Sequence, residues 1–185
     1  MIKLNAKQLR ISNPSLEQLR HLHHFPIILV LDNIIDTFNI GSFFRLADAI
    51  AAKKIYLCGR TITPPNVKIH RASIGTWRWV PWEHKLSTLE VVKKLKGKGY
   101  QTVAAEQSRE SIPYTKFKPN FPTALVVGHE TIGVSKEVLA EVDKIVEIPM
   151  FGVNLSLNVL VSASIILYDW LTKTKVKFPN HPRKV

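Results

Sequence analysis

Blocks of apolar residues alternate along the chain with amphipathic segments. The segment PIILVLD (26–32) is a continuous apolar run, as expected of a strand buried on both faces. Shorter apolar runs predict four further strands, at 54–59, 100–105, 123–128 and 144–150. Helical spacing of apolar residues predicts intervening helices, over 39–52, 87–99, 134–142 and from about Ser156 to 171. This alternation predicts an α/β domain with three layers and a mainly parallel sheet.

The chain shows no internal repeat, low-complexity tract or interdomain linker. We therefore expect one domain over 1–185, with a helical extension at 1–25 and a tail at 172–185 that carries five Lys or Arg and no acidic residue. Two segments, 60–86 and 106–122, are longer than ordinary connections, and long ordered loops are often functional.

Charge is the first functional signal. Twenty-six Lys and Arg against fourteen Asp and Glu give a net charge of +12, which favours a polyanionic partner such as nucleic acid. The alternative is that the excess only maintains solubility. The single cysteine, Cys58, lies in an apolar run; it suits a buried position and a reducing cytoplasm.

Several function classes lack their signatures. The chain contains no G-x-G-x-x-G turn and no G-x-x-x-x-G-K-[ST] loop, which counts against ordinary dinucleotide and ATP sites. It has no membrane-length apolar run and no apolar signal region at its start, so we expect a cytoplasmic protein. His21, His23 and His24 sit together without carboxylates at metal-ligand spacing, and exposed helix surface is the better interpretation.

Three glycine-containing stretches follow predicted strands, at the sheet edge where α/β proteins bind ligands. They are NIGSFFRLADA (39–49), GHETIG (128–133) and IPMFGVNLSLNV (148–159). Together, in this order, they resemble the three motifs of the SpoU or TrmH-like branch of the SPOUT RNA methyltransferases. The resemblance spans roughly residues 26–171.

The resemblance implies a carboxyl-terminal trefoil knot that binds S-adenosylmethionine, a homodimer whose active sites draw on both subunits, and methylation of a ribose 2′-hydroxyl of RNA. It implies that the catalytic residues are Asn39, Arg45, Glu130, Ser156 and Asn158. The cofactor-binding positions it implies are Gly128, Ile148, Met150 and Leu157, with Ala104 and Ala105 at the end of the strand 100–105. No metal is implied. We expect tRNA rather than rRNA as the substrate.

Each of these residues also has a structural explanation. Asn39 and Ser156 suit helix capping, Arg45 suits a surface position with a buried stem, and Glu130 suits a salt bridge. Trp77, Trp79 and Trp82 suit base stacking, or packing in the core or a dimer interface. Two other functions stay open: a catalytically silent RNA-binding protein on the same scaffold, and an α/β nucleotide-binding enzyme unrelated to RNA.

Overall fold

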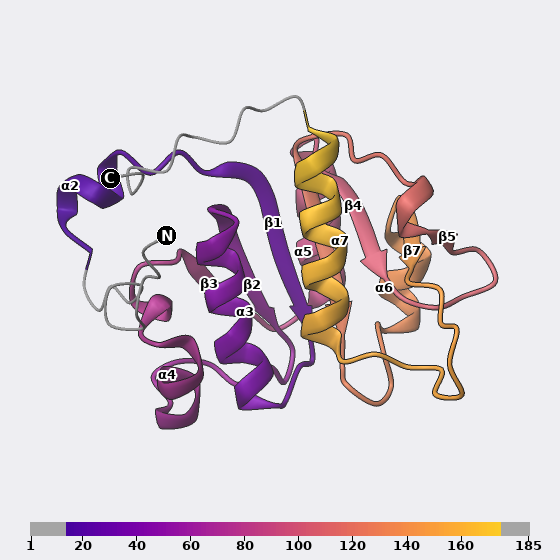
Figure 1. Cartoon of the computed structure of the whole chain (residues 1–185), viewed down its shortest axis with the longest axis horizontal. Coiled ribbons are helices and arrows are strands. Elements are labelled where there is room, and N and C mark those ends of the chain that lie inside the picture. Colours follow the sequence, from indigo (N-terminus) through magenta and orange to yellow (C-terminus); the bar gives the residue numbers. More distant parts are fainter. Residues whose placement is uncertain (1–13, 175–185) are drawn as a thin grey trace, which may run out of the picture.

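A seven-stranded parallel sheet forms the centre of the molecule, in a computed structural model that describes residues 14–174 (Figure 1). The strand order is β3-β2-β1-β6-β4-β7-β5. The strands are β1 (Phe25–Asp32), β2 (Ala52–Cys58), β3 (Trp82–Lys85), β4 (Gln101–Ala105), β5 (Ile112–Pro113), β6 (Thr123–Gly128) and β7 (Lys144–Glu147). The α-helices are α2 (Leu16–Arg20), α3 (Thr37–Ala49), α4 (Val67–Ser73), α5 (Thr88–Gly97), α6 (Lys136–Glu141) and α7 (Val159–Lys173).

Alternate side chains of the central strand β1 enter two separate cores. Ile27, Leu29 and Leu31 pack with residues of α3 and α7 on one face of the sheet. Ile28 and Val30 pack with residues of α5 and α6 on the other. Burial on both faces explains why this strand reads as an unbroken apolar run. The predicted three-layer architecture is confirmed.

The two long segments contain structure that the apolar pattern does not predict. Segment 60–86 holds α4, the short 3-10 helix η1 (Thr76–Arg78) and the edge strand β3; segment 106–122 holds the two-residue strand β5 and the 3-10 helix η2 (Tyr114–Lys116). Both extra strands lie at sheet edges. An edge strand is paired on one side only, so its sequence needs no continuous apolar run.

The tryptophans of segment 60–86 pack against the core. Trp79 donates its indole N–H to Asp48 at 2.7 Å, and the Trp82 ring meets Phe44 edge to face at 6.3 Å between centroids. Trp77 is also partly buried against the same core cluster. These contacts favour the packing interpretation over base stacking.

Two helix starts differ from the sequence prediction. The helix α3 begins at Thr37, and its cap is Asp36, whose carboxylate accepts from the Phe38 N–H at 2.7 Å. Asn39 therefore lies within the first turn. The helix α7 begins at Val159, and Asn158 caps it. Ser156 lies in the preceding loop, so the capping interpretations of Asn39 and Ser156 are wrong.

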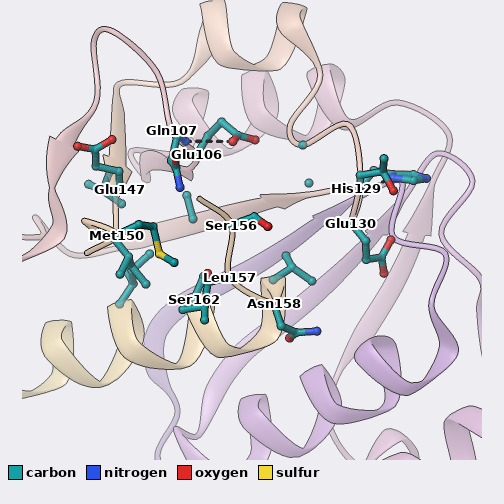
Figure 2. A pocket seen from close by; sticks show the side chains of 18 of the residues that line it. Glu106, Gln107, His129, Glu130, Glu147, Met150, Ser156, Leu157, Asn158 and Ser162 are labelled. Carbon is teal, nitrogen blue, oxygen red and sulfur yellow. Dashed lines mark hydrogen bonds between the residues drawn. The ribbon is translucent and has the colours of Figure 1, made fainter. Parts of the chain in front are cut away.

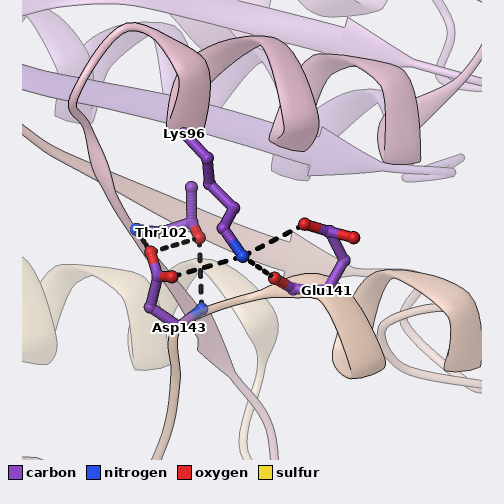
Figure 3. Close-up of polar contacts among 4 residues, drawn as sticks. All are labelled: Lys96, Thr102, Glu141 and Asp143. Carbon is purple, nitrogen blue, oxygen red and sulfur yellow. Dashed lines mark hydrogen bonds and ion pairs between the residues drawn. The ribbon is translucent and has the colours of Figure 1, made fainter.

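A polar cluster fastens α5 and β4 to the connection between α6 and β7 (Figure 3). The Lys96 ammonium contacts the carboxylates of Glu141 at 3.0 Å and Asp143 at 3.3 Å. The second Asp143 oxygen accepts from the backbone N–H and the hydroxyl of Thr102, each at 2.8 Å. Partial burial alone would raise the pKa of Asp143, but the Thr102 hydrogen bonds and Lys96 lower it below its ordinary value.

Cys58 ends β2 and is completely buried, as the sequence predicts. Burial raises the pKa of its thiol to about 12, and the nearby Asp32 carboxylate acts in the same direction. Within residues 14–174, no helix is both long and apolar enough to cross a bilayer. The described residues also contain no group of three or more side chains suited to hold a metal ion.

Candidate functional site

A cavity of about 410 Å³ opens at the carboxyl ends of β4, β6 and β7 (Figure 2). The first turn of α7 and the loop before it form one wall. Of the residues predicted from the sequence, those that line the cavity are Ala105, Gly128, Glu130, Ile148, Met150, Ser156, Leu157 and Asn158. Three chain segments, which follow β4, β6 and β7, therefore meet around one space; the stretches 128–133 and 148–159 line it, but no residue of the stretch 39–49 does.

Three of the predicted catalytic side chains form one hydrogen-bonded chain. Asn158 donates its side-chain amide to the Asn39 amide oxygen at 3.1 Å. Asn39 in turn donates to a Glu130 carboxylate oxygen, also at 3.1 Å. The Asn158 oxygen is itself occupied, because it accepts from the backbone N–H groups at the start of α7. The network thus links all three motifs and orients both amides.

Glu130 also holds the chain that enters α3. Its carboxylate accepts from the backbone N–H groups of Asp36 at 3.1 Å and Ile35 at 3.3 Å. Partial burial would raise the pKa of Glu130, but the hydrogen bond from Asn39 and those backbone donors lower it. Glu130 is therefore ionised at neutral pH. No ion pair within 14–174 involves it, so its partners are neutral donors rather than a lysine.

Glycine is required at position 128 by close packing. A Cβ atom there would lie 2.1 Å from the Gly133 carbonyl carbon and from the Val134 nitrogen, far inside contact distance. Gly133 adopts a positive φ of 71°, and Glu106 lies against it. The Glu106 carboxylate accepts from the Val134 N–H at 2.9 Å. The loop after β6 is thus held down on the end of the sheet.

Three carboxylates line the cavity, from Glu106, Glu130 and Glu147. The Glu147 carboxylate accepts from the Ser111 hydroxyl at 2.8 Å, so each of the three has a fixed donor. Neither lysine nor arginine occurs among the lining residues that the structure describes. The cavity therefore favours a cationic ligand, although the whole chain carries a net charge of +12.

Two predicted catalytic residues stand apart from this network. Arg45 is exposed on α3 and does not line the cavity. At 100° per residue it points about a third of a turn away from Asn39 on the same helix. Ser156 lines the cavity, but it is exposed, and among residues 14–174 its hydroxyl contacts only Asn154, at 3.5 Å.

Ala104 also lies outside the cavity lining, unlike its neighbour Ala105. The reason is that successive side chains of a strand face opposite sides of the sheet. Ala104 enters the core beneath α5 and α6. Ala105 packs with the core on the α7 side, where the cavity opens.

Glu106, Gln107 and Glu147 line the cavity although sequence reasoning did not single them out. Glu106 and Gln107 are the first two residues after β4, and Glu147 ends β7, so position at the strand carboxyl end was the available signal. Figure 2 shows Glu147 and Met150 at one end of the cavity and Glu130 with His129 at the other. Gln107 donates its side-chain amide to the Leu155 carbonyl at 2.7 Å and so supports the loop before α7.

The fold and the cavity define a class: a parallel α/β protein whose three carboxyl-end loops enclose one ligand site. Residues 26–168 match the SpoU rRNA Methylase family, and the chain belongs to that family.

Individual relatives agree with this assignment. Over 144 residues the chain is 34% identical to the tRNA (guanosine(18)-2′-O)-methyltransferase of Aquifex aeolicus. The matched region covers 77% of this chain and 67% of that protein. It is 29% identical over 144 residues to the putative TrmH family tRNA/rRNA methyltransferase YacO of Bacillus subtilis, which covers 78% of this chain and 57% of that protein. The chain thus spans little more than half the length of the latter.

A solved structure shares the fold. The SpoU methyltransferase AviRb from Streptomyces viridochromogenes, in complex with the cofactor AdoMet, superimposes with a TM-score of 0.73 at 27% identity. The match covers 86% of this chain and 64% of that chain.

Proposed function

We propose that this chain is an S-adenosylmethionine-dependent RNA methyltransferase that modifies a ribose 2′-hydroxyl. The observation that carries the proposal is the Asn158–Asn39–Glu130 network, which joins the three family motifs at the edge of an acidic cavity. The names of the relatives, which include RNA 2′-O-methyltransferases, support the same activity.

The cavity fits this cofactor in size and in chemistry. A volume of about 410 Å³ lies within the range of small-molecule sites. Apolar side chains among the lining residues, from Ile148, Met150 and Leu157, suit an adenine ring. The carboxylates of Glu106 and Glu130 suit the cationic sulfonium and ammonium groups.

Bound S-adenosylmethionine supplies an electrophilic methyl group. In the transfer, the ribose 2′-oxygen forms a bond to the methyl carbon while the sulfur–carbon bond breaks, and the hydroxyl proton passes to an acceptor. Such a reaction depends mainly on alignment. We assign Glu130 to holding Asn39 and the start of α3, because its lowered pKa and its three donors make it a weak base. Arg45 suits a clamp on the phosphate beside the target ribose.

Arg45 points away from the cavity of its own chain. In a homodimer, it would act at the cavity of the partner subunit. Apolar side chains that a partner could cover lie near the cavity: Phe151 and Val153 in the loop before α7 are fully exposed, and Phe38 at the start of α3 is 60% exposed. We therefore propose that each active site combines the cavity of one subunit with Arg45 of the other.

Mixed dimers test this arrangement. When inactive Arg45→Ala and inactive Asn158→Ala subunits are mixed, about half of the dimers contain both, and one of their two sites is then intact. About a quarter of wild-type activity should return. If Arg45 serves its own subunit's cavity, mixing will restore nothing.

The remaining parts of the proposal follow the family. We propose a cytoplasmic protein that acts on tRNA in preference to rRNA, that forms one domain over 1–185, and that threads α7 through a trefoil knot. The extension at 1–25 is described only from residue 14 and contains α2 (Leu16–Arg20), and the tail at 172–185 is described only to residue 174; the rest lies outside the described residues.

Calorimetric titration with S-adenosylmethionine tests the enzyme assignment, followed by transfer of labelled methyl groups to bulk tRNA. We expect binding at micromolar to millimolar cofactor and incorporation into RNA. Binding of RNA without binding of cofactor would instead support the catalytically silent RNA-binding protein.

A further inference from the structure

The acidic cavity cannot also be the main site for RNA phosphates, because its lining combines three carboxylates with no lysine or arginine among the described residues. A polyanion needs a cationic surface close to the same site. The segment 60–82, between β2 and β3, carries four Lys or Arg and no Asp or Glu. It therefore has the charge that the cavity lacks.

This segment is packed directly against the helix that carries Asn39. A Cβ atom on Gly41 would lie 2.6 Å from the Ala72 side chain and 2.7 Å from the Ile69 carbonyl oxygen, so α4 crosses α3 in close contact at that position. Figure 1 shows α4 beside the amino-terminal end of α3, at the same end of the sheet as the strand carboxyl ends. Gly41 follows Asn39 by two residues, or about 200° around the helix, so α4 packs on the side of α3 that faces away from the Asn39–Glu130 network.

Arg45 lies on the same face of α3. Gly41, Arg45 and Asp48 are spaced four and three residues apart, so they share one face of the helix. On that face, Gly41 and Asp48 both contact segment 60–82. Gly41 meets α4, and the Asp48 carboxylate accepts from Trp79 at 2.7 Å. The exposed Arg45 side chain therefore borders this segment and extends its positive charge.

Three of the four cations of the segment, Lys68, Arg71 and Arg78, are exposed on α4 and η1. Lys68 and Arg71 are three residues apart, so they are neighbours on the outer face of α4. Arg78 lies with its guanidinium carbon 5.9 Å from the centre of the Trp77 ring, and the Trp77 indole donates to His70 at 3.1 Å. None of the three cations takes part in an ion pair within residues 14–174. Their charges are available to an outside ligand.

We propose that α4 and η1 form the RNA-docking surface, with Lys68, Arg71 and Arg78 contacting backbone phosphates next to the target nucleotide. The inference rests on the proposed function, because this surface would bind the RNA substrate of that activity. The positive charge selects RNA by its phosphates, and the fixed position of α4 against α3 sets docked phosphates beside Arg45, which in the proposed homodimer serves the cavity of the partner subunit.

The test compares two variants that each lose three positive charges. The docking variant is Lys68→Ala/Arg71→Ala/Arg78→Ala. The matched control is Lys93→Ala/Lys94→Ala/Lys98→Ala, on or just after α5, which covers the opposite face of the sheet. All six side chains are exposed, so both proteins should fold. Binding of bulk tRNA is measured from about 50 to 300 mM salt, and S-adenosylmethionine binding is measured by calorimetry.

Each lost phosphate contact should reduce the slope of log K against log salt by about 0.7 to 0.9. We expect the magnitude of this slope to fall by about two or more in the docking variant and to change little in the control. Cofactor affinity should stay at the wild-type value in both variants. In the double variant Lys68→Ala/Arg71→Ala, which leaves the Arg78–Trp77 contact intact, the slope should fall by about two-thirds of the change in the docking variant.

Equal slopes for the docking variant and the control would overturn the inference. So would an altered oligomeric state with an unchanged slope, which would make this surface a contact between copies of the chain. Either result leaves the proposed function standing if the wild-type protein binds cofactor and methylates RNA. Failure of the wild-type protein to bind cofactor would refute the proposed function instead.

Discussion

Replacing Asn39 with Asp changes one group of the central network while keeping its shape. The Asn39 amide nitrogen lies 3.1 Å from a Glu130 oxygen, and in Asn39→Asp a second carboxylate oxygen would occupy that position. A favourable hydrogen bond is thus replaced by contact between two like charges. Asn39 is 7% exposed, so the new charge has little access to water.

The expected loss of stability in Asn39→Asp follows from the distance between position 39 and the Glu130 carboxylate. Two unit charges at 3.1 Å repel by about 1.3 kcal/mol at the dielectric constant of water and by about 5 kcal/mol at an effective value near 20. Glu130 itself is largely exposed, which places the repulsion toward the lower value. With the lost hydrogen bond, we expect the free energy of unfolding to fall by about 2 kcal/mol at pH 7.

This difference should shrink in acid. In the wild-type protein the pKa of Glu130 is lowered by folding, so its contribution is present above the unfolded pKa and is lost as the pH falls. In Asn39→Asp, repulsion raises the folded pKa of one carboxyl, so the destabilisation is present at high pH and disappears once that group takes a proton. Both effects reduce the difference in unfolding free energy between the two proteins as the pH falls toward the ordinary carboxyl pKa of about 4.

Urea unfolding followed by tryptophan fluorescence, at pH 7 and at pH 4.5, measures this. Asn66→Asp is the matched control: it also exchanges an amide for a carboxylate, but at the amino end of α4, outside the network, where negative charge is favourable. We expect the control to stay within about 1 kcal/mol of wild type. If Asn39→Asp is as stable as wild type at pH 7, or its deficit does not shrink in acid, the assigned network is incorrect.

Three further outcomes are expected. Gly128→Ala forces a Cβ atom into the Gly133 backbone, so it should cost about 1–3 kcal/mol of stability and weaken cofactor binding in calorimetry, whereas Gly152→Ala, with nothing within 4 Å, should leave cofactor binding unchanged. Asp143→Asn should lower the melting temperature at pH 7, and its deficit should shrink as the pH falls below the ordinary aspartate pKa of about 3.9, because the lowered pKa of Asp143 stabilises the fold only while the carboxylate is charged. With a pKa of about 12, Cys58 should resist alkylation at pH 8 in the native protein and react once urea unfolds it; rapid native reaction would contradict its burial.

The strongest sequence signals came from buried elements. A central strand such as β1 is apolar on both faces, so its sequence alone identifies it and implies helices on either side. Edge elements carry no such signal. The strand β3 reads WEHK, and its place in the sheet follows from pairing with β2 rather than from its own composition.

Helix starts show a second limit. Asp36, Asn39, Ser156 and Asn158 are all residue types that cap helices, and the sequence cannot decide among neighbours of the same kind. The structure assigns capping to Asp36 and Asn158, which leaves the Asn39 side chain for Glu130.

The meeting of the three motifs was predictable, but the direction of each side chain was not. Parallel strands bring their carboxyl-end loops together, so Gly128, Glu130 and Asn158 were expected near one another. Arg45 lies six residues beyond Asn39 on the same helix and points elsewhere, because 3.6 residues complete a turn. Glu106 and Glu147 were overlooked, since an isolated glutamate after a strand has no distinctive pattern.

The position of the transferred methyl group tests the central claim most directly. Bulk tRNA is incubated with the purified protein and methyl-labelled S-adenosylmethionine, and the RNA is then hydrolysed in alkali. Alkali cleaves RNA through a free 2′-hydroxyl, so label on a ribose 2′-oxygen remains in dinucleotides that resist cleavage. The account predicts label in resistant dinucleotides, lost in Asn39→Ala. Label in mononucleotides, which would place the methyl group on a base, or no incorporation with cofactor bound, would contradict it.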